Sequence, residues 1–168
     1  LYVGTLREHK GIELLIETAA ELPDGVGVEI VGGGPERESL EALAAHADLD
    51  DIVTFHGWVD HADLPAYYNE ADVFIHPGHW PEPFNRTLLE AMQYDCALVV
   101  SEIGAPPWVV ADCGVSFERW SVYDLRRHLT TVVTVTELRR SLQQNCADRL
   151  TEVLPERVIS EIDAQYHS

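Results

Sequence analysis

The stretch ADVFIHPGHWPEPFNRTLLEAM, residues 71–92, decides the fold class of this chain. Residues 71–76 form an apolar run with the length of a buried strand. A long proline-rich loop follows them, and a helix is predicted from about Asn85 to Tyr94. A buried strand that passes through a loop into a helix is the repeating unit of a parallel sheet.

The rest of the chain repeats this alternation of strand and helix. The other predicted strands are residues 1–4, 26–31, 52–55, 97–101 and 115–117. The other predicted helices are residues 11–22, 36–47, 64–70, 106–111, 122–135, 137–150 and 156–166. The stretch 130–136 is rich in β-branched residues, so a strand is the alternative to a helix there. The alternation predicts an α/β fold, a Rossmann-like doubly wound parallel sheet with helices on both faces, in a single domain spanning residues 1–168.

Composition excludes several classes of protein. The chain has 168 residues, 46% of them hydrophobic, so it can bury a core of normal size. No apolar run reaches the roughly 20 residues of a membrane-spanning helix. Asp and Glu number 29 against 11 Lys and Arg, and the formal charge of −18 disfavours binding to nucleic acid or to an anionic membrane. Because the acids are scattered, we interpret them as a surface suited to high salt, as in a halophile; the alternative is a cationic partner.

The cysteines bear on the cellular compartment. Cys96, Cys113 and Cys146 are widely spaced and form neither a CxxC pair nor a zinc pattern. We expect reduced thiols in the core of a cytoplasmic protein. The chain begins at Leu1, directly in an apolar strand, and we expect it to be a fragment of something longer.

Two loops stand out as a candidate ligand site. If the strand order is 3-2-1-4-5-6, the loops after the first and fourth strands lie side by side, where such sheets bind ligands. These loops are residues 5–10 and 77–84. The first carries Arg7 and Lys10, the only lysine, just before a helix N-terminus, and this combination predicts a diphosphate clamp. The alternative is a pair of surface charges neutralised by neighbouring acids, Glu8 or Glu13.

A glycine-rich turn, residues 32–35, separates the second strand from its helix. A dinucleotide-binding fingerprint requires a further glycine at position 37, where this chain has Arg37. NAD binding is therefore poorly supported. We expect a tight structural turn whose backbone can approach a ligand closely.

Two glutamates flank the start of the predicted helix after the proline-rich loop. In a continuous helix Glu82 and Glu90 would lie ~12 Å and ~80° apart, so we do not expect a proton-sharing dyad. They can instead hold two ends of an extended polar ligand, because carboxylates accept hydrogen bonds from sugar hydroxyls. His76, His79 and Glu82 also have a spacing that can bind a metal ion, and this alternative stays open.

Taken in order, the motifs resemble the C-terminal half of the GT-B glycosyltransferases, specifically the retaining family-4 type. The motifs are GTL at 4–6, KG at 10–11, VGGGP at 31–35, FHG at 55–57, ADVFIHP at 71–77, the E-x7-E pair within 82–92, VVSEIG at 99–104, Gly114 and Tyr166. They cover nearly the whole chain at fitting spacing. No single motif is decisive, but the ordered set is specific.

The resemblance implies a domain that binds the donor for transfer of a sugar from a nucleoside-diphosphate sugar to an acceptor, with retention of anomeric configuration. It implies that the acceptor domain is N-terminal and absent from this chain, which alone would not turn over. It also implies no metal or other cofactor, and membrane contact only through the missing half.

The resemblance also assigns roles to individual residues. The implied catalytic residues are Lys10 and Arg7 on the diphosphate and Glu82 on the donor sugar. The implied donor-binding residues are Thr5, Gly33, Gly34, His56, Gly57, Phe84, Asn85, Arg86 and Glu90. Within this set Glu90 holds the ribose hydroxyls, and the backbone N–H groups of Phe84 and Asn85 face the phosphates. The chain departs from the family at Thr5, where an arginine is usual, and at Asn85, where a glycine is usual.

Two other functions stay open at this stage. A non-catalytic interaction module on the same fold would use Trp80, Pro81 and Trp108 as a contact patch, whereas ordinary packing is the alternative for these side chains. A sugar-nucleotide epimerase with a related fold is the other possibility.

Overall fold

The structure, a computed structural model, describes residues 1–82 and 85–153. Phe84 and the predicted helix 156–166 lie outside the described residues. The strands are β1 (Tyr2–Val3), β2 (Val28–Val31), β3 (Val53–Gly57), β4 (Val73–His76), β5 (Ala97–Ser101) and β6 (Gly114–Phe117). The α-helices are α1 (Ile12–Ala19), α2 (Arg37–His46), α3 (Leu64–Glu70), α4 (Arg86–Gln93), α5 (Pro106–Val110), α6 (Val122–Thr134) and α7 (Thr136–Val153). Short 3-10 turns are η1 (Glu8–Lys10), η2 (His61–Asp63) and η3 (Ala111–Cys113).

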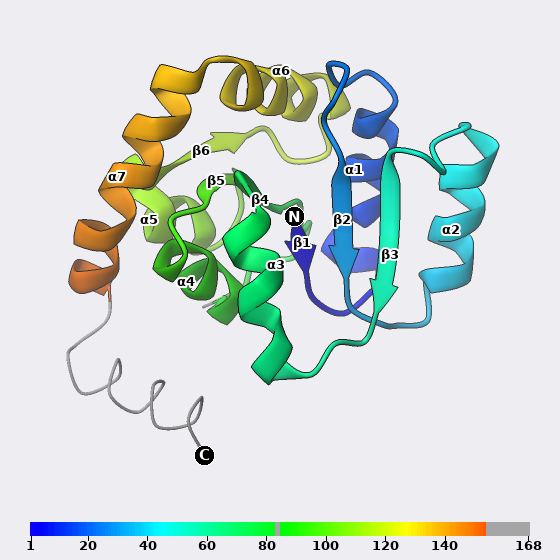
Figure 1. The fold of residues 1–168 in the computed structure, drawn as a ribbon, viewed down its shortest axis with the longest axis horizontal. Helices are drawn as coiled ribbons and strands as arrows, with labels where there is room; N and C mark the ends of the chain where they lie inside the picture. Colours follow the sequence, from blue (N-terminus) through cyan, green and yellow to red (C-terminus); the bar gives the residue numbers. More distant parts are fainter. Residues whose placement is uncertain (83–84, 154–168) are drawn as a thin grey trace.

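The strands form two parallel half-sheets, β1-β2-β3 and β4-β5-β6. Leu1 joins the two halves, because its nitrogen donates to Val73 O at 2.8 Å and its carbonyl accepts from Ile75 N at 2.9 Å. The spatial order is therefore 3-2-1-4-5-6, the order on which the predicted site depends, with β1 and β4 at the junction of the half-sheets (Figure 1).

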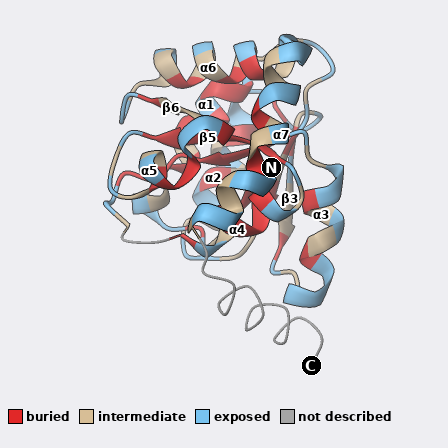
Figure 2. Ribbon diagram, turned by 90° about the vertical axis from the view of Figure 1, so that its left-hand side faces the viewer, coloured by how far each residue is buried: buried red, intermediate tan, exposed pale blue. Residues whose placement is uncertain are grey.

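Helices cover both faces of the sheet, because alternate residues of each inner strand are buried on opposite sides. Ile75 and Val99 face a core that includes α1, α2 and α6. Phe74 and Leu98 face a second core that includes α3, α4 and α5. Figure 2 shows the buried residues on the sheet and on the inner faces of the helices, with the outer faces exposed. The predicted Rossmann-like α/β class is confirmed.

The three cysteines lie in the second core, and all are buried and free of disulfides, as predicted. Cys113 Sγ donates to Val110 O at 2.8 Å, and Cys146 Sγ donates to Cys96 O at 3.4 Å. Burial raises the pKa of the Cys96 thiol to about 12. These thiols pack as small apolar groups and help to fix α7 against the sheet.

Most predicted elements match the structure to within a few residues, and the helix predicted over residues 122–135 is confirmed as α6. The β-branched stretch 130–136 is helical through Thr134, because its apolar residues pack against α1, and only Val135 interrupts the helix. The three 3-10 turns were not predicted, because single turns carry no hydrophobic period. Within residues 1–82 and 85–153, the helices all lack the combined length and apolarity that crossing a bilayer requires.

Candidate functional site

The loops after β1 and β4 are in direct contact at the junction of the half-sheets. Gly11 has φ +68°, and a Cβ atom there would lie only 2.2 Å from Pro77 O. His79 N donates to His9 O at 2.9 Å across the same contact. The two loops that the sequence marked as a candidate site therefore form one surface at the carboxyl edge of the sheet.

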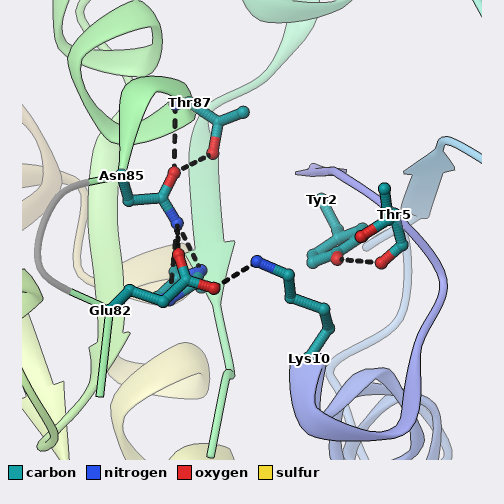
Figure 3. Close-up of polar contacts among 7 residues, drawn as sticks. Tyr2, Thr5, Lys10, Glu82, Asn85 and Thr87 are labelled. Carbon is teal, nitrogen blue, oxygen red and sulfur yellow. Dashed lines mark hydrogen bonds and ion pairs between the residues drawn. The ribbon is translucent and has the colours of Figure 1, made fainter. Parts of the chain in front are cut away.

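Lys10 and Glu82 form an ion pair between these loops (Figure 3). Both side chains are less than one-fifth exposed, so water screens the pair only partly. The sequence left open a pairing of Lys10 with Glu13, but Glu13 Oε1 instead contacts His79 Nε2 at 2.7 Å. The only lysine of the chain is thus held beside the glutamate that the E-x7-E motif singled out.

Asn85 connects Glu82 to the start of α4. Its Oδ1 accepts from Thr87 N at 3.0 Å, an N-cap contact, and from Thr87 Oγ1 at 2.6 Å. Its Nδ2 donates to Glu82 Oε2 at 3.1 Å. Asn85 has φ −122° and ψ 109°, an ordinary extended conformation. The asparagine therefore causes no backbone strain at a position where the family usually has glycine.

His76, the last residue of β4, contacts the same nitrogen of the Asn85 carboxamide as Glu82 does. Asn85 Nδ2 is 3.1 Å from His76 Nδ1. Burial lowers the pKa of His76 to about 4; the carboxylate of Glu82 opposes this shift and the ammonium of Lys10 adds to it. His76 is therefore neutral at pH 7 and available as a hydrogen-bond acceptor.

Glu82 is also fixed through its backbone. Its carbonyl accepts from Ala105 N at 3.1 Å, in the turn between β5 and α5. Gly104 in that turn has φ +67°, and a Cβ atom there would lie 2.9 Å from Glu82 N. Only glycine fits this approach without strain, so the VVSEIG motif supports the loop that carries Glu82.

Glu90 is buried on α4 and has a different set of partners. Tyr68 Oη donates to its Oε2 at 2.9 Å, and His61 Nε2 lies 3.4 Å from its Oε1. Because Glu82 and Glu90 contact separate groups, they do not share a hydrogen bond, in agreement with the sequence-based expectation.

The glycine-rich turn after β2 packs against the loop after β1. A Cβ atom at Gly32 would lie 1.8 Å from Gly4 O, and one at Gly34 would lie 2.2 Å from Leu6 O. Gly33, by contrast, has open space around its Cβ position, while its carbonyl accepts from Leu6 N at 3.0 Å. Gly32 and Gly34 are therefore required for the packing of the turn, whereas Gly33 leaves room for a ligand to approach the backbone.

The remaining predicted residues have other neighbours or are exposed. His56 contacts Glu29 and packs edge-on to Tyr67 at 4.8 Å. Gly57 has φ +74° beside the guanidinium of Arg37. Three predicted residues, Thr5, Arg7 and Arg86, are exposed. Within the described part of the chain, neither Arg7 nor Arg86 forms a side-chain hydrogen bond or ion pair.

Sequence reasoning missed the roles of four residues around the two glutamates. His76 and Thr87 contact Asn85, which in turn contacts Glu82, whereas Tyr68 and His61 contact Glu90 directly. Only the helix start at Asn85 carried a signal, because Asn is a preferred N-cap residue. The alternative metal site is not assembled: His76 and His79 have separate partners, and residues 1–82 and 85–153 hold no group of three candidate ligands.

The tryptophans are not packed in the core. Trp80 is 64% exposed and Trp108 is 65% exposed, so neither ring is packed in the core. Trp108 lies under the guanidinium of Arg149, 5.1 Å from its ring centre, and Trp120 stacks on His79 at 3.4 Å.

Comparison with known proteins agrees with the fold. Residues 1–149 match the family described as glycosyl transferases group 1. The alpha-D-kanosaminyltransferase of Streptomyces kanamyceticus is 28% identical over 152 residues, 88% of this chain and 39% of that protein. The GDP-mannose-dependent alpha-mannosyltransferase of Mycolicibacterium smegmatis is 35% identical over 112 residues, 67% of this chain and 28% of that protein. The Anabaena protein Alr3699/HepE, solved in complex with UDP, superposes with a TM-score of 0.86 at 23% identity, covering 98% of this chain and 46% of that one.

The fold and the order of its motifs define a Rossmann-like domain of the GT-B glycosyltransferase class. The chain belongs to the glycosyl transferases group 1. It spans less than half the length of each of the three proteins compared.

Proposed function

We propose that this chain is the donor-binding half of a glycosyltransferase that moves a sugar from a nucleoside-diphosphate sugar to an acceptor with retention of configuration. The observation that carries the proposal is the contact between Lys10 and Glu82 at the junction of the half-sheets. This edge of a doubly wound sheet is where such folds bind nucleotides. Of the proteins compared, the mannosyltransferase is GDP-mannose-dependent, and the Anabaena protein was solved in complex with UDP.

The charge at this junction suits the leaving group of the reaction. Cleavage of the anomeric C–O bond leaves a nucleoside diphosphate with growing negative charge. We assign the stabilisation of that charge to Lys10, with the exposed Arg7 as a second cation, and we include no resident metal or cofactor. In a chain of formal charge −18, these cations mark the edge at which an anion can bind.

Donor binding then requires Lys10 to exchange partners. The ammonium leaves the carboxylate of Glu82 for the diphosphate, and Glu82 becomes free to accept hydrogen bonds from the sugar hydroxyls. Glu82 orients the sugar and is not assigned as a nucleophile. Glu90, oriented by Tyr68, is assigned to the ribose hydroxyls.

The acceptor is assigned to a separate N-terminal domain, outside this chain. The proposal is supported by the coverage of the relatives, of which the chain spans 39% and 28%. Acceptor, linkage and any membrane contact would belong to that domain. The buried free thiols and the charge of −18 support a cytoplasmic protein without nucleic-acid partners.

Calorimetric titration with UDP, GDP, UDP-glucose and GDP-mannose in high salt tests the proposal. We expect one saturable site for at least one of these nucleotides, weakened about tenfold by Lys10→Ala, a loss of about 1.4 kcal/mol. The matched control is Arg140→Ala, which removes the same charge from an exposed position on α7. Absence of binding by all four nucleotides, or equal effects of the two substitutions, would contradict the proposal.

The exposure of Trp80 and Trp108 favours one other candidate, a non-catalytic interaction module. A partner retained by Trp80→Ala but lost on Lys10→Ala would argue against it. A partner retained by Lys10→Ala and Glu82→Ala but lost on Trp80→Ala would favour it.

A further inference from the structure

The carboxamide of Asn85 uses all of its hydrogen-bonding groups inside the protein. Its oxygen accepts from the backbone and the hydroxyl of Thr87. Its nitrogen lies 3.1 Å from both Glu82 Oε2 and His76 Nδ1. The residue is only 8% exposed, so these contacts are shielded from water.

The orientation of this carboxamide follows from its partners. A backbone N–H group can only donate, so the atom that faces Thr87 N is the oxygen. The two hydrogens on Nδ2 therefore point to Glu82 and His76. His76 Nδ1 is the nearer ring nitrogen, because Nε2 lies at 3.5 Å. Nδ1 must accept, which places the proton of the neutral imidazole on Nε2.

These contacts continue to the ion pair. Lys10 holds one oxygen of the Glu82 carboxylate, and Asn85 holds the other (Figure 3). Asn85 cannot turn away without losing both the cap on α4 and its contact with His76. When an anion draws Lys10 away, Asn85 is the partner that keeps the carboxylate in place.

We propose that Asn85 and His76 are positioning residues for Glu82: neutral His76 and the start of α4 fix the Asn85 carboxamide, and Asn85 aims the carboxylate at the donor sugar. This role rests on the proposed function for the identity of the ligand. The resemblance assigns to Asn85 a backbone N–H group that faces the phosphates. The role proposed here belongs instead to its side chain, which contacts Glu82.

Two substitutions separate this role from capping. Asn85→Asp keeps an N-cap oxygen but places a second carboxylate beside Glu82. Asn85→Ser also caps a helix well, but its side chain is too short to bridge to Glu82 and His76. Since Ser, Asp and Asn cap about equally well, both variants should keep the stability of α4.

The first experiment needs no ligand. Nitrogen-15 NMR of the histidine rings should show His76 with an unprotonated Nδ1, neutral from pH 7 down to about pH 4. In Asn85→Asp the proton should move to Nδ1, which then donates to the new carboxylate, and the pKa of His76 should rise by about one unit or more. The same tautomer and titration in wild type and Asn85→Asp would overturn the proposal.

The second experiment asks whether the role concerns the sugar. Because Glu82 is assigned to the sugar, Asn85→Ser should change the affinity for UDP or GDP by no more than about twofold. The additional affinity that the attached glucose or mannose provides should fall about tenfold. Glu82→Gln should reduce the same gain. Equal losses for nucleotide and nucleotide sugar would place Asn85 on the phosphates and overturn the proposal.

A failure of the proposed function would look different. If wild type binds none of the four nucleotides, the ligand assignment falls, and the positioning of Glu82 is judged by the Asn85 carboxamide protons. These should exchange slowly with water in the wild type, and faster in Glu82→Ala. Equal exchange in the two proteins would overturn the positioning as well.

Discussion

Lys10 and Glu82, 72 positions apart in the sequence, form an ion pair that ties the loop after β1 to the loop after β4. The pair bridges the two half-sheets at the point where the strand order reverses direction. Both groups are mostly shielded from water, so their attraction is stronger than that of an exposed pair. The same contact joins the cation that we assign to the diphosphate and the carboxylate that we assign to the sugar.

The first prediction concerns this pair. Lys10→Ala should destabilise the protein by about 1 kcal/mol, or lower Tm by about 2–4 °C, because a shielded carboxylate loses its counterion. In a double-mutant cycle with Glu82→Ala, the two effects should couple by at least about 0.5 kcal/mol. Additive effects, or an equal loss in Arg140→Ala, would show that only the net charge matters.

The second prediction tests how closely the loops approach. Gly11→Ala places a Cβ atom 2.2 Å from Pro77 O at φ +68°, whereas Gly25→Ala introduces a Cβ at φ +84° with no atom within 4 Å. Gly25→Ala should cost about 1 kcal/mol of backbone strain. Gly11→Ala should cost about 2 kcal/mol more, because the loops must also separate. Urea denaturation of both variants measures the difference, and equal midpoints would contradict the contact.

Much of the fold could be predicted because apolar runs and breakers mark the elements clearly. Leu64–Glu70 and Ala97–Ser101 have the predicted bounds, since charged or turn residues delimit both. The approach of the two loops that carry Lys10 and Glu82 also followed from strand order, whereas the pairing of these two side chains was not predicted.

The contacts made by individual side chains could not be predicted in the same way. The pairing of His56 with Glu29 depends on the β2–β3 register, in which Glu29 lies opposite Thr54 and His56 follows on the same face. The Asn85 contacts depend on where β4 ends relative to the start of α4. Such distances arise from tertiary packing, and local patterns do not encode them.

The third prediction concerns the buried glutamate of α4. Tyr68→Phe removes the hydroxyl that donates to Glu90 at 2.9 Å in a buried position, so it should destabilise the protein by about 1 kcal/mol. It should also weaken nucleotide binding, because Glu90 loses a group that orients it. Tyr123→Phe, at a position 68% exposed, is the matched control and should change neither property. Unchanged nucleotide affinity in Tyr68→Phe would remove the assignment of Glu90 to the ribose.

The fourth prediction concerns salt. Among the acidic side chains that the structure describes, Glu90 alone is buried, so the charge of −18 lies mainly on the outside and repels itself. Raising KCl shortens the screening length from about 10 Å at 0.1 M to about 3 Å at 1 M. Thermal melts should therefore show Tm rising across this range. The highest Tm at low salt would contradict both this prediction and the halophile hypothesis.

The fifth prediction is the contribution of His76 to stability against pH. Burial lowers its pKa from 6.5 to about 4 in the folded protein, so between these values the unfolded chain binds a proton that the folded chain excludes. Folding stability attributable to His76 is therefore fully present above about pH 6.5 and falls toward pH 4, by about 1.4 kcal/mol per pH unit at most and on the order of 3 kcal/mol in total. Urea denaturation at several pH values should show that the free energy of unfolding falls less steeply with acid in His76→Gln than in the wild type, because glutamine does not titrate. Because the carboxylates titrate in both proteins, the difference between the two curves isolates His76. Parallel curves would mean that His76 accepts a proton in the folded state as readily as in water, which would contradict the pKa lowered by burial.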